Sequence, residues 1–138
     1  MSTSTTELTV GAVMLTVDQI PVVSEKTLLK ETLEAMTRRR LGIACLVDAN
    51  GQLRGIFTDG DVRRMLLRDQ KPFSALFADD IAIHANANPA TVSPDDDLVA
   101  AVRLMEEKGI WDLPVKDQSG RLTGLLHLHP AIKALLGV

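Results

Sequence analysis

Residues 55–67 read GIFTDGDVRRMLL: apolar residues come first, a short polar turn follows, and the remainder has the amphipathic spacing of a helix. This order predicts a strand that runs into a helix N-terminus. The hydroxyl of Thr58, the carboxylate of Asp61 and the free backbone N–H groups of the first helical turn would then lie in one small space. Such a place suits a phosphate or a ribose.

A weaker copy of this stretch, GLLHLHP, occupies residues 124–130. When the chain is shifted by 69 positions, residues match in kind and in order over most of its length, which predicts an internal duplication. In the first copy the expected elements are a helix with its apolar face at Leu29, Leu33 and Met36, strands at 43–47 and 53–57, and a helix at about 61–68. Units of about 60 residues are marginal alone, so the two copies are expected to share a core.

The starts of the helices are predicted from capping residues. Ser24 is expected to cap the first helix. In the second copy residues 93–97 read SPDDD, which predicts the serine as N-cap, the proline at the first helical position and three aspartates at the positive end of the helix dipole. After the last strand, Pro130 is expected in the first turn of a helix that His129 caps.

Composition argues against several classes of function. The 138 residues carry a formal net charge of -3 and only 3% aromatic residues, so neither a phosphate-backbone binder nor a base-stacking platform for nucleic acid is expected. No apolar segment approaches the ~20 residues that span a bilayer, and residues 1–9 are expected to be a disordered lead-in rather than a signal peptide. Cys45, the single cysteine, is expected in the core and favours a reducing cytoplasm as the compartment.

Each copy resembles the CBS motif, in which an apolar strand and a glycine precede Thr-x-x-Asp at the start of a helix. The two copies in tandem resemble a CBS pair, or Bateman module, over residues 10–136. The resemblance implies an α/β fold of two β-α-β-β-α repeats packed about a pseudo-twofold axis. The expected organisation is a lead-in at 1–9, CBS repeat 1 at 10–68, a connector at 69–77 and CBS repeat 2 at 78–138, with a short helix between about 73 and 81.

More narrowly, LRGIFTDGDVRR at residues 53–64 resembles the first repeat of the regulatory half of arabinose 5-phosphate isomerases. GLLHLH at 124–129 resembles the second repeat of that family, in which His replaces the usual hydroxyl residue. The resemblance implies a parent protein whose sugar isomerase domain interconverts ribulose 5-phosphate and arabinose 5-phosphate for Kdo and lipopolysaccharide synthesis. This chain would be its regulatory C-terminal part without the catalytic domain, and a freestanding CBS protein is the alternative.

Thr58 and Asp61 have two interpretations. They can form a capping box, in which each side chain accepts a hydrogen bond from a backbone N–H group. The CBS resemblance instead implies that Thr58 binds a nucleotide phosphate or ribose and that Asp61 accepts from the ribose diol, a task that suits a carboxylate. We include Asp59, Gly60 and Arg63 in this expected ligand site. Arg63 or Arg64 would either lie on a solvated helix face or turn back toward an anionic ligand.

The resemblance also implies walls for this site. Their expected residues are Ile20, Pro21, Val22, Ile43 and Ala44, although core packing also explains the side chains of Ile20, Ile43 and Ala44. In the second copy His127 stands at the threonine position and Pro130 at the aspartate position, so a ribose clamp is not expected there. His127 and His129 are candidates for contacts to a phosphate or sugar acid. No metal is expected, because no Cys or acid is evident nearby in the sequence.

No nucleophile–base pair, Walker-type loop or purposeful carboxylate pair is apparent, so this chain alone is not expected to be an enzyme. The expected function is a nucleotide-sensing regulatory module that requires no cofactor. The family context implies CMP-Kdo as the first-choice ligand and AMP or ATP as the second. The alternative is an assembly module with empty clefts. A homodimer is expected through the helices that carry Leu66, Leu67, Leu135 and Leu136, beside the isomerase domain of the parent chain.

Overall fold

The computed structural model describes residues 8–138; the expected lead-in falls largely on residues 1–7, outside the described range. The chain divides into two compact units. Residues 18–89 form the first, here named the Thr58 unit. Residues 90–138 together with the described residues 8–17 form the second, here named the His127 unit. A short 3-10 helix, η2 (Val17–Gln19), lies where the chain passes between them.

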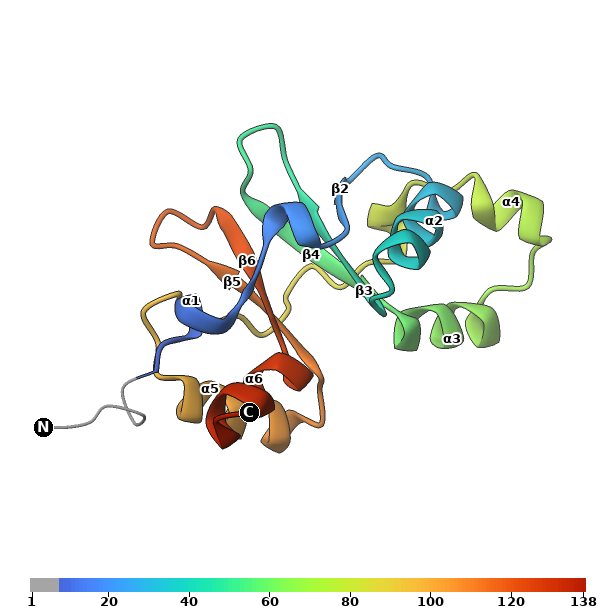
Figure 1. Cartoon of the computed structure of the whole chain (residues 1–138). Helices are drawn as coiled ribbons and strands as arrows, with labels where there is room; N and C mark the ends of the chain where they lie inside the picture. Colours follow the sequence, from blue (N-terminus) through green and yellow to red (C-terminus); the bar gives the residue numbers. More distant parts are fainter. Residues whose placement is uncertain (1–7) are drawn as a thin grey trace, which may run out of the picture. The chain divides into compact units, whose positions relative to one another are not determined.

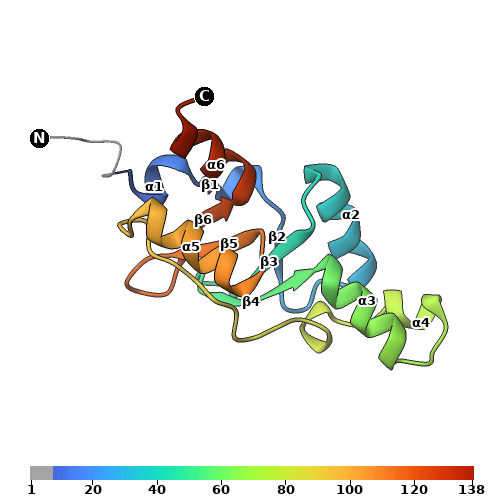
Figure 2. The ribbon, with the colours of Figure 1, turned by 90° about the horizontal axis from the view of Figure 1, so that it is seen from below.

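The Thr58 unit is an α/β unit around a three-stranded sheet (Figure 1). Its sheet has the order β2-β3-β4, with β2 parallel to β3 and β3 antiparallel to β4. Its elements are β2 (Val22–Ser24), α2 (Leu29–Arg39), β3 (Ile43–Val47), β4 (Leu53–Thr58), α3 (Asp59–Arg68), α4 (Phe73–Phe77) and the 3-10 helix η3 (Ile81–Ile83). Figure 2 shows α3 leaving the end of β4, with α4 following it. The core joins Leu29 and Met36 of α2 to Leu46, Phe57 and Met65.

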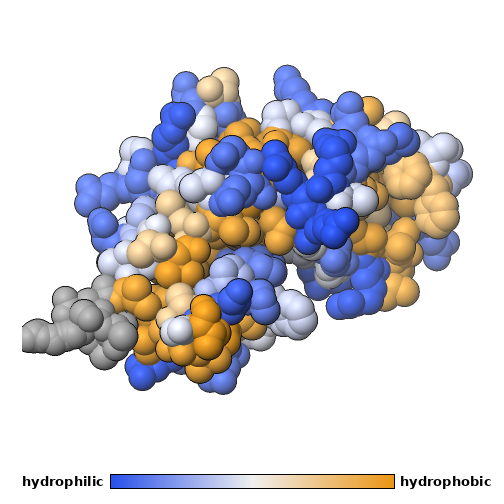
Figure 3. All heavy atoms as spheres, in the orientation of Figure 1, coloured by the Kyte–Doolittle hydropathy of each residue, from blue (hydrophilic) through white to orange (hydrophobic). Residues whose placement is uncertain are grey.

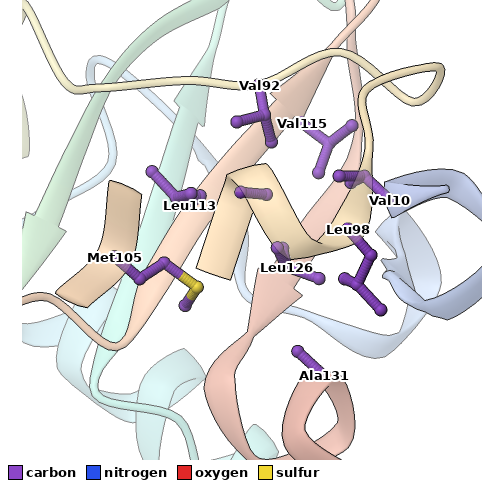
Figure 4. Packing of buried hydrophobic residues seen from close by; sticks show 9 residues of the cluster. Val10, Val92, Leu98, Met105, Leu113, Val115, Leu126 and Ala131 are labelled. Carbon is purple, nitrogen blue, oxygen red and sulfur yellow. The ribbon is translucent and has the colours of Figure 1, made fainter. Parts of the chain in front are cut away.

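The His127 unit repeats this plan. Its elements are α1 (Val10–Val13), β1 (Leu15–Thr16), α5 (Leu98–Lys108), β5 (Asp112–Lys116), β6 (Leu122–His127) and α6 (Leu128–Leu136). The sheet order is β1-β6-β5, and both pairings are antiparallel. Figure 4 shows the core, in which Leu98 and Met105 of α5 pack with Leu113, Val115 and Leu126 of the sheet.

The two units keep the same register at a shift of 69 residues. Ile43 pairs with Thr58 in one hairpin, and Asp112 pairs with His127 in the other. Each hairpin has a bulge at the same place, after Leu46 and after Val115. The left-handed residue that ends α2 is Arg40, with φ of 55°, and its counterpart after α5 is Gly109, with φ of 64°. Such agreement confirms the predicted internal duplication and the α/β repeat fold.

Each repeat supplies a segment to the sheet of the other unit. β1 precedes the first repeat's main strands, yet it pairs with β6 at Leu15 and Leu125. In the same way Asn86, which precedes the second repeat's strands, pairs with Ile56 of β4. Gly55 makes this crossing possible, because a Cβ there would lie 2.7 Å from the Asn86 carbonyl oxygen. At Gly124 a Cβ would likewise collide with the carbonyl oxygen of Leu15.

Three predicted helix starts are wrong. Ser24 ends β2, where its N–H donates to Thr27 Oγ1, and α2 begins five residues later. Ser93 and Pro94 stay in a turn in which Ser93 N–H donates to Asp96, so α5 begins only at Leu98, with Asp97 as its N-cap. The serines satisfy their own local turns and do not cap the helices. His127 rather than His129 occupies the N-cap of α6, although Pro130 does lie in its first turn, as predicted.

Other expectations are confirmed. Both hairpins lie where the apolar runs predicted them, α4 and η3 occupy the region where a short helix was expected, and Cys45 is buried. Leu66, Leu67 and Leu136 are exposed, whereas Leu135 packs against the core of its unit. Figure 3 shows hydrophobic side chains at the surface over α6. Among the described helices none combines the length and the apolar character needed to cross a membrane.

Candidate functional site

The N-terminus of α3 is a closed capping box. Thr58 has extended backbone, with φ of -125° and ψ of 167°, and is the N-cap of the helix. Its Oγ1 accepts a hydrogen bond from Asp61 N–H at 3.2 Å, while Asp61 Oδ2 accepts from Thr58 N–H at 2.9 Å. The Thr58 hydroxyl also donates to Asp61 Oδ2 at 3.1 Å. The two side chains therefore satisfy each other's backbone groups, as the capping interpretation predicted.

The second oxygen of Asp61 is occupied as well. Arg64 Nη2 donates to Asp61 Oδ1 at 2.7 Å, one helical turn further on. The Arg64 side chain is 62% exposed, whereas that of Asp61 is only 13% exposed. The guanidinium also lies over Gly60, because a Cβ on that residue would be 3.2 Å from both Nη1 and Nη2. Of the two arginines that sequence reasoning left open, Arg64 is the one that folds back onto the helix start.

An open pocket of about 420 Å³ lies beside this helix start. Asp59 N–H donates to the Gly42 carbonyl oxygen at 3.0 Å, which joins the first turn of α3 to the start of β3. The Asp59 carboxylate covers Gly42, where a Cβ would lie 2.6 Å from Oδ2. The other lining residues come from the end of α2 and the turn after it: Leu33, Met36, Thr37, Arg40 and Leu41. The pocket lining therefore combines apolar side chains with one threonine, one arginine and one acid.

The predicted wall residues are mostly core. Ile20, Ile43 and Ala44 are buried, with exposures of 3%, 1% and 0%. Pro21 is also buried, and its carbonyl oxygen accepts from Cys45 N–H at 2.9 Å. Val22 is half-buried in β2. The side chains of Ile20, Pro21, Ile43 and Ala44 therefore serve the packing of the Thr58 unit.

The corresponding place in the His127 unit is built differently. His127 is the N-cap of α6, but its side chain makes no capping hydrogen bond. Its Nδ1 lies 2.7 Å from Asp112 Oδ1, on the neighbouring strand β5. The expectation that no acid is near His127 was therefore wrong. The missed signal is the register itself, because Asp112 stands opposite His127 in the hairpin just as Ile43 stands opposite Thr58.

The remaining predicted residue of that unit, His129, is exposed in the first turn of α6. Pro130 occupies the third helical position, where an N–H group would have no partner within the helix, so the proline costs no hydrogen bond. Within residues 8–138 no cluster of three or more His, Cys, Asp or Glu side chains could hold a metal ion.

A second polar cluster lies at the other end of α3. His84 is buried, and its Nε2 lies 2.9 Å from Asp79 Oδ2. Lys71 donates to Asp79 at 3.0 Å, and these hydrogen bonds, first from Lys71 and then from His84, lower the pKa of Asp79. The hydrogen bond from Arg68 similarly lowers the pKa of Asp69. This cluster ties the connector after α3 to the helix and lies outside the predicted site.

Comparison with known protein families finds the same domain twice, once in each half of the chain. The model of the CBS domain matches residues 10–68 and 78–137. These matches follow the sequence repeats, whereas in the compact units the first residues of each repeat belong to the unit that holds the strands of the other repeat.

Curated relatives include the arabinose 5-phosphate isomerase KdsD of Escherichia coli K12, 34% identical over 129 residues. The same enzyme of Pseudomonas aeruginosa is 34% identical over 127 residues. In both cases the alignment covers 92% of this chain, but only 37% and 38% of the relative. The chain thus spans little more than a third of the length of these relatives.

Solved structures share the fold over most of the chain. CBSX2 in complex with AMP has a TM-score of 0.82 and 27% identity, over 94% of this chain and 96% of that one. The CBS domain pair of MJ0100 in complex with 5′-methylthioadenosine and S-adenosyl-L-methionine has a TM-score of 0.77 over 94% and 96%. At 19% identity this second likeness concerns the fold alone.

Proposed function

The chain belongs to the CBS-domain family, and we propose that its two CBS domains form a regulatory module that binds a nucleotide at the start of α3. The observation that carries this proposal is the Thr58–Asp61 pair at the N-terminus of a ten-residue helix, beside an open pocket. A hydroxyl, a carboxylate and helix N–H groups together match the phosphate and diol of a nucleotide. CBSX2, which shares the fold at 27% identity, forms a complex with AMP.

In the bound state the Thr58 hydroxyl would contact the phosphate or ribose and Asp61 would accept from the ribose hydroxyls. Asp59, Gly60 and the backbone at the ends of β2 and β3 would line the site, through residues 20–22, 43 and 44. On binding, Asp61 would exchange one of its internal donors for a donor of the ligand. His127 and His129 remain proposed contacts for a phosphate or a sugar acid.

The finer proposal concerns the parent protein. The 34% identity to arabinose 5-phosphate isomerase over nearly the whole chain supports the idea that this pair regulates such an isomerase, whose catalytic domain would hold the chemistry. CMP-Kdo, a later product of the pathway implied by that family, is then the first-choice ligand and AMP or ATP the second. Regulation would follow if the ligand binds one arrangement of the module more tightly than another.

Isothermal titration tests this proposal. CMP-Kdo, CMP, AMP and ATP are titrated into the wild-type chain and into Asp61→Asn, which keeps an acceptor for the helix cap and removes the charge. Binding that weakens at least tenfold in Asp61→Asn supports a nucleotide site at α3, and the best ligand identifies what is sensed. Asp80→Asn, an exposed acid in the same unit, is the matched control and should bind as the wild type does.

A second candidate function is supported by exposed apolar side chains. Leu66 and Leu67 of α3 have exposures of 46% and 80%, and Leu136 of α6 has an exposure of 71%, so each of these two helices carries apolar side chains that suit a homodimer contact. If none of the four ligands binds and sedimentation still finds dimers, the assembly function replaces the nucleotide-sensing one. Monomers that bind no nucleotide would contradict both proposals.

A further inference from the structure

Resting on the proposed function, we propose that Arg64 makes the α3 site selective for ligands with a phosphate, because a phosphate draws its guanidinium away from Asp61. The ligand class is then a phosphorylated ribonucleoside rather than a nucleoside. Arg64 would pair with Asp61 before the ligand binds and with the phosphate group of the ligand afterwards.

The first step concerns the acceptor capacity of Asp61. Its Oδ2 accepts two hydrogen bonds from Thr58, at 2.9 Å from the N–H and 3.1 Å from the hydroxyl. Its Oδ1 accepts from Arg64 Nη2 at 2.7 Å, and the carboxylate is only 13% exposed. These bonds take three of the roughly four acceptor sites of a carboxylate, so a ribose diol that donates two hydrogen bonds has to displace one of these donors.

The second step identifies which donor moves. The bonds to Thr58 cap α3, so displacing them would destabilise the start of the helix. Arg64 is instead 62% exposed, reaches Asp61 from one turn along the helix, and has a long flexible side chain. An exposed ion pair of this kind is weak and easily exchanged. The Asp61–Arg64 contact is therefore the one that a diol opens.

The third step concerns charge. A nucleoside that takes Oδ1 leaves the guanidinium without its counter-ion, so it gains a diol contact at the loss of an ion pair. A nucleotide brings a replacement anion to the same helix start, and a guanidinium binds phosphate with two parallel hydrogen bonds. Because Arg64 already lies over Gly60 in the first turn, a phosphate at that turn is within reach of a small side-chain rotation. The phosphorylated ligand is therefore favoured because it frees Asp61 for the diol and also gives the Arg64 guanidinium a new anionic partner.

This mechanism predicts opposite effects of one substitution. In Arg64→Gln the phosphate loses its partner, so the Kd of AMP should rise about tenfold, at the low end of the range for a charge-assisted hydrogen bond. Adenosine no longer competes with Arg64, so its Kd should stay level or fall about two- to threefold, the size of a weak surface ion pair. Isothermal titration of AMP and adenosine, repeated with CMP and cytidine, measures both changes. Arg39→Gln removes the same charge from an exposed position on α2 and should change neither Kd.

Several results would overturn the inference. If Arg64→Gln changes the Kd of nucleotide and nucleoside by the same factor, Arg64 acts through the stability of the helix and not through selectivity. If the loss appears in Arg63→Gln instead, the neighbouring arginine is the anion-binding group. If the wild-type chain binds none of the four probes, the proposed function itself fails and this inference fails with it. Arg64→Lys keeps the charge, and we expect it to retain most of the preference for the nucleotide.

Discussion

Thr58 and His127 occupy the same backbone position in the two repeats, each at the end of a strand and at the N-cap of a helix. At Thr58 the acid that accompanies the cap comes from the helix itself, three residues later. At His127 the acid is Asp112 on the neighbouring strand. The helix position that corresponds to Asp61 holds Pro130. The acid serves as a cap in one unit and as an imidazole partner in the other. The duplicated backbone thus fixes where a polar site can form, while the side chains decide what it can bind.

The largest loss of stability is expected at Gly55 and Gly124, the glycines that lie against a backbone carbonyl oxygen in each unit. Gly124→Ala would push a Cβ into the Leu15 carbonyl oxygen and should cost about 3 kcal/mol of unfolding free energy. Gly55→Ala meets the Asn86 carbonyl oxygen less closely and should cost about 1–2 kcal/mol. Urea denaturation followed by circular dichroism measures both. Gly109→Asn is the control, since its side chain would enter open space and asparagine tolerates left-handed backbone; equal stability of all three variants would contradict the steric account.

The next effect separates the two N-caps. Thr58→Ala removes an acceptor for the Asp61 N–H and should destabilise the chain by about 1 kcal/mol. His127→Ala removes no capping bond, so a smaller loss is expected at pH 7. The difference between their urea midpoints is the measurement. Losses of the same size would mean that the His127–Asp112 contact stabilises α6 as effectively as a capping box does.

Low pH should destabilise the Thr58 unit through the carboxylates of Asp69 and Asp79, in the segment that follows α3. The pKa of Asp79 is lowered in the folded chain by Lys71 and His84, and that of Asp69 by Arg68. A lowered folded pKa stabilises the chain above the unfolded value, near pH 4, and this contribution is lost as the pH falls through the folded value. Urea midpoints between pH 2 and 7 should therefore fall less steeply below pH 4 in Asp79→Asn than in the wild type. Identical pH profiles would show that the cluster adds no stability.

The smallest effect compares the two hairpin turns. Asp48 and Asp117 each accept backbone N–H groups in their own turn, but Asp117 also accepts from the Ser119 hydroxyl at 2.6 Å, where the first repeat has Asn50. This hydroxyl is the main reason that the pKa of Asp117 is lowered. Ser119→Ala should move that pKa back toward its ordinary value, as measured by carboxyl-carbon NMR titration. No change would assign the lowering to the backbone donors alone.

Sequence reasoning located what depends on local pattern. A short apolar run and an Asn-Gly turn predicted the first hairpin, and the shift of 69 residues predicted the duplication and with it the second hairpin. Helix starts were missed at Ser24 and Ser93, because a serine can satisfy its own turn as readily as it caps a helix. The strand exchange was also missed, since the two-residue strand β1 carries no periodic signal.

At the candidate site, too, local sequence patterns predicted some contacts, whereas others depend on strand pairing. The capping geometry of Thr58 and Asp61 follows from their spacing and was foreseen as one of two interpretations. The choice between Arg63 and Arg64 depends on the three-residue spacing from Asp61, which places Arg64 on the same helix face. Asp112 required the pairing register, because it is distant from His127 in the sequence and adjacent only across the hairpin.

The exchanged strand also matters while the chain is being synthesised. Leu15 must wait for Leu125, and at an elongation rate of about 5–20 residues per second the wait lasts on the order of 5–20 s. The Thr58 unit can meanwhile assemble, because its segment 18–89 is contiguous and Asn86 follows Ile56 closely. Residues 8–17 thus find their place only after β6 has been made, and the His127 unit closes only when segments 8–17 and 90–138 are both present.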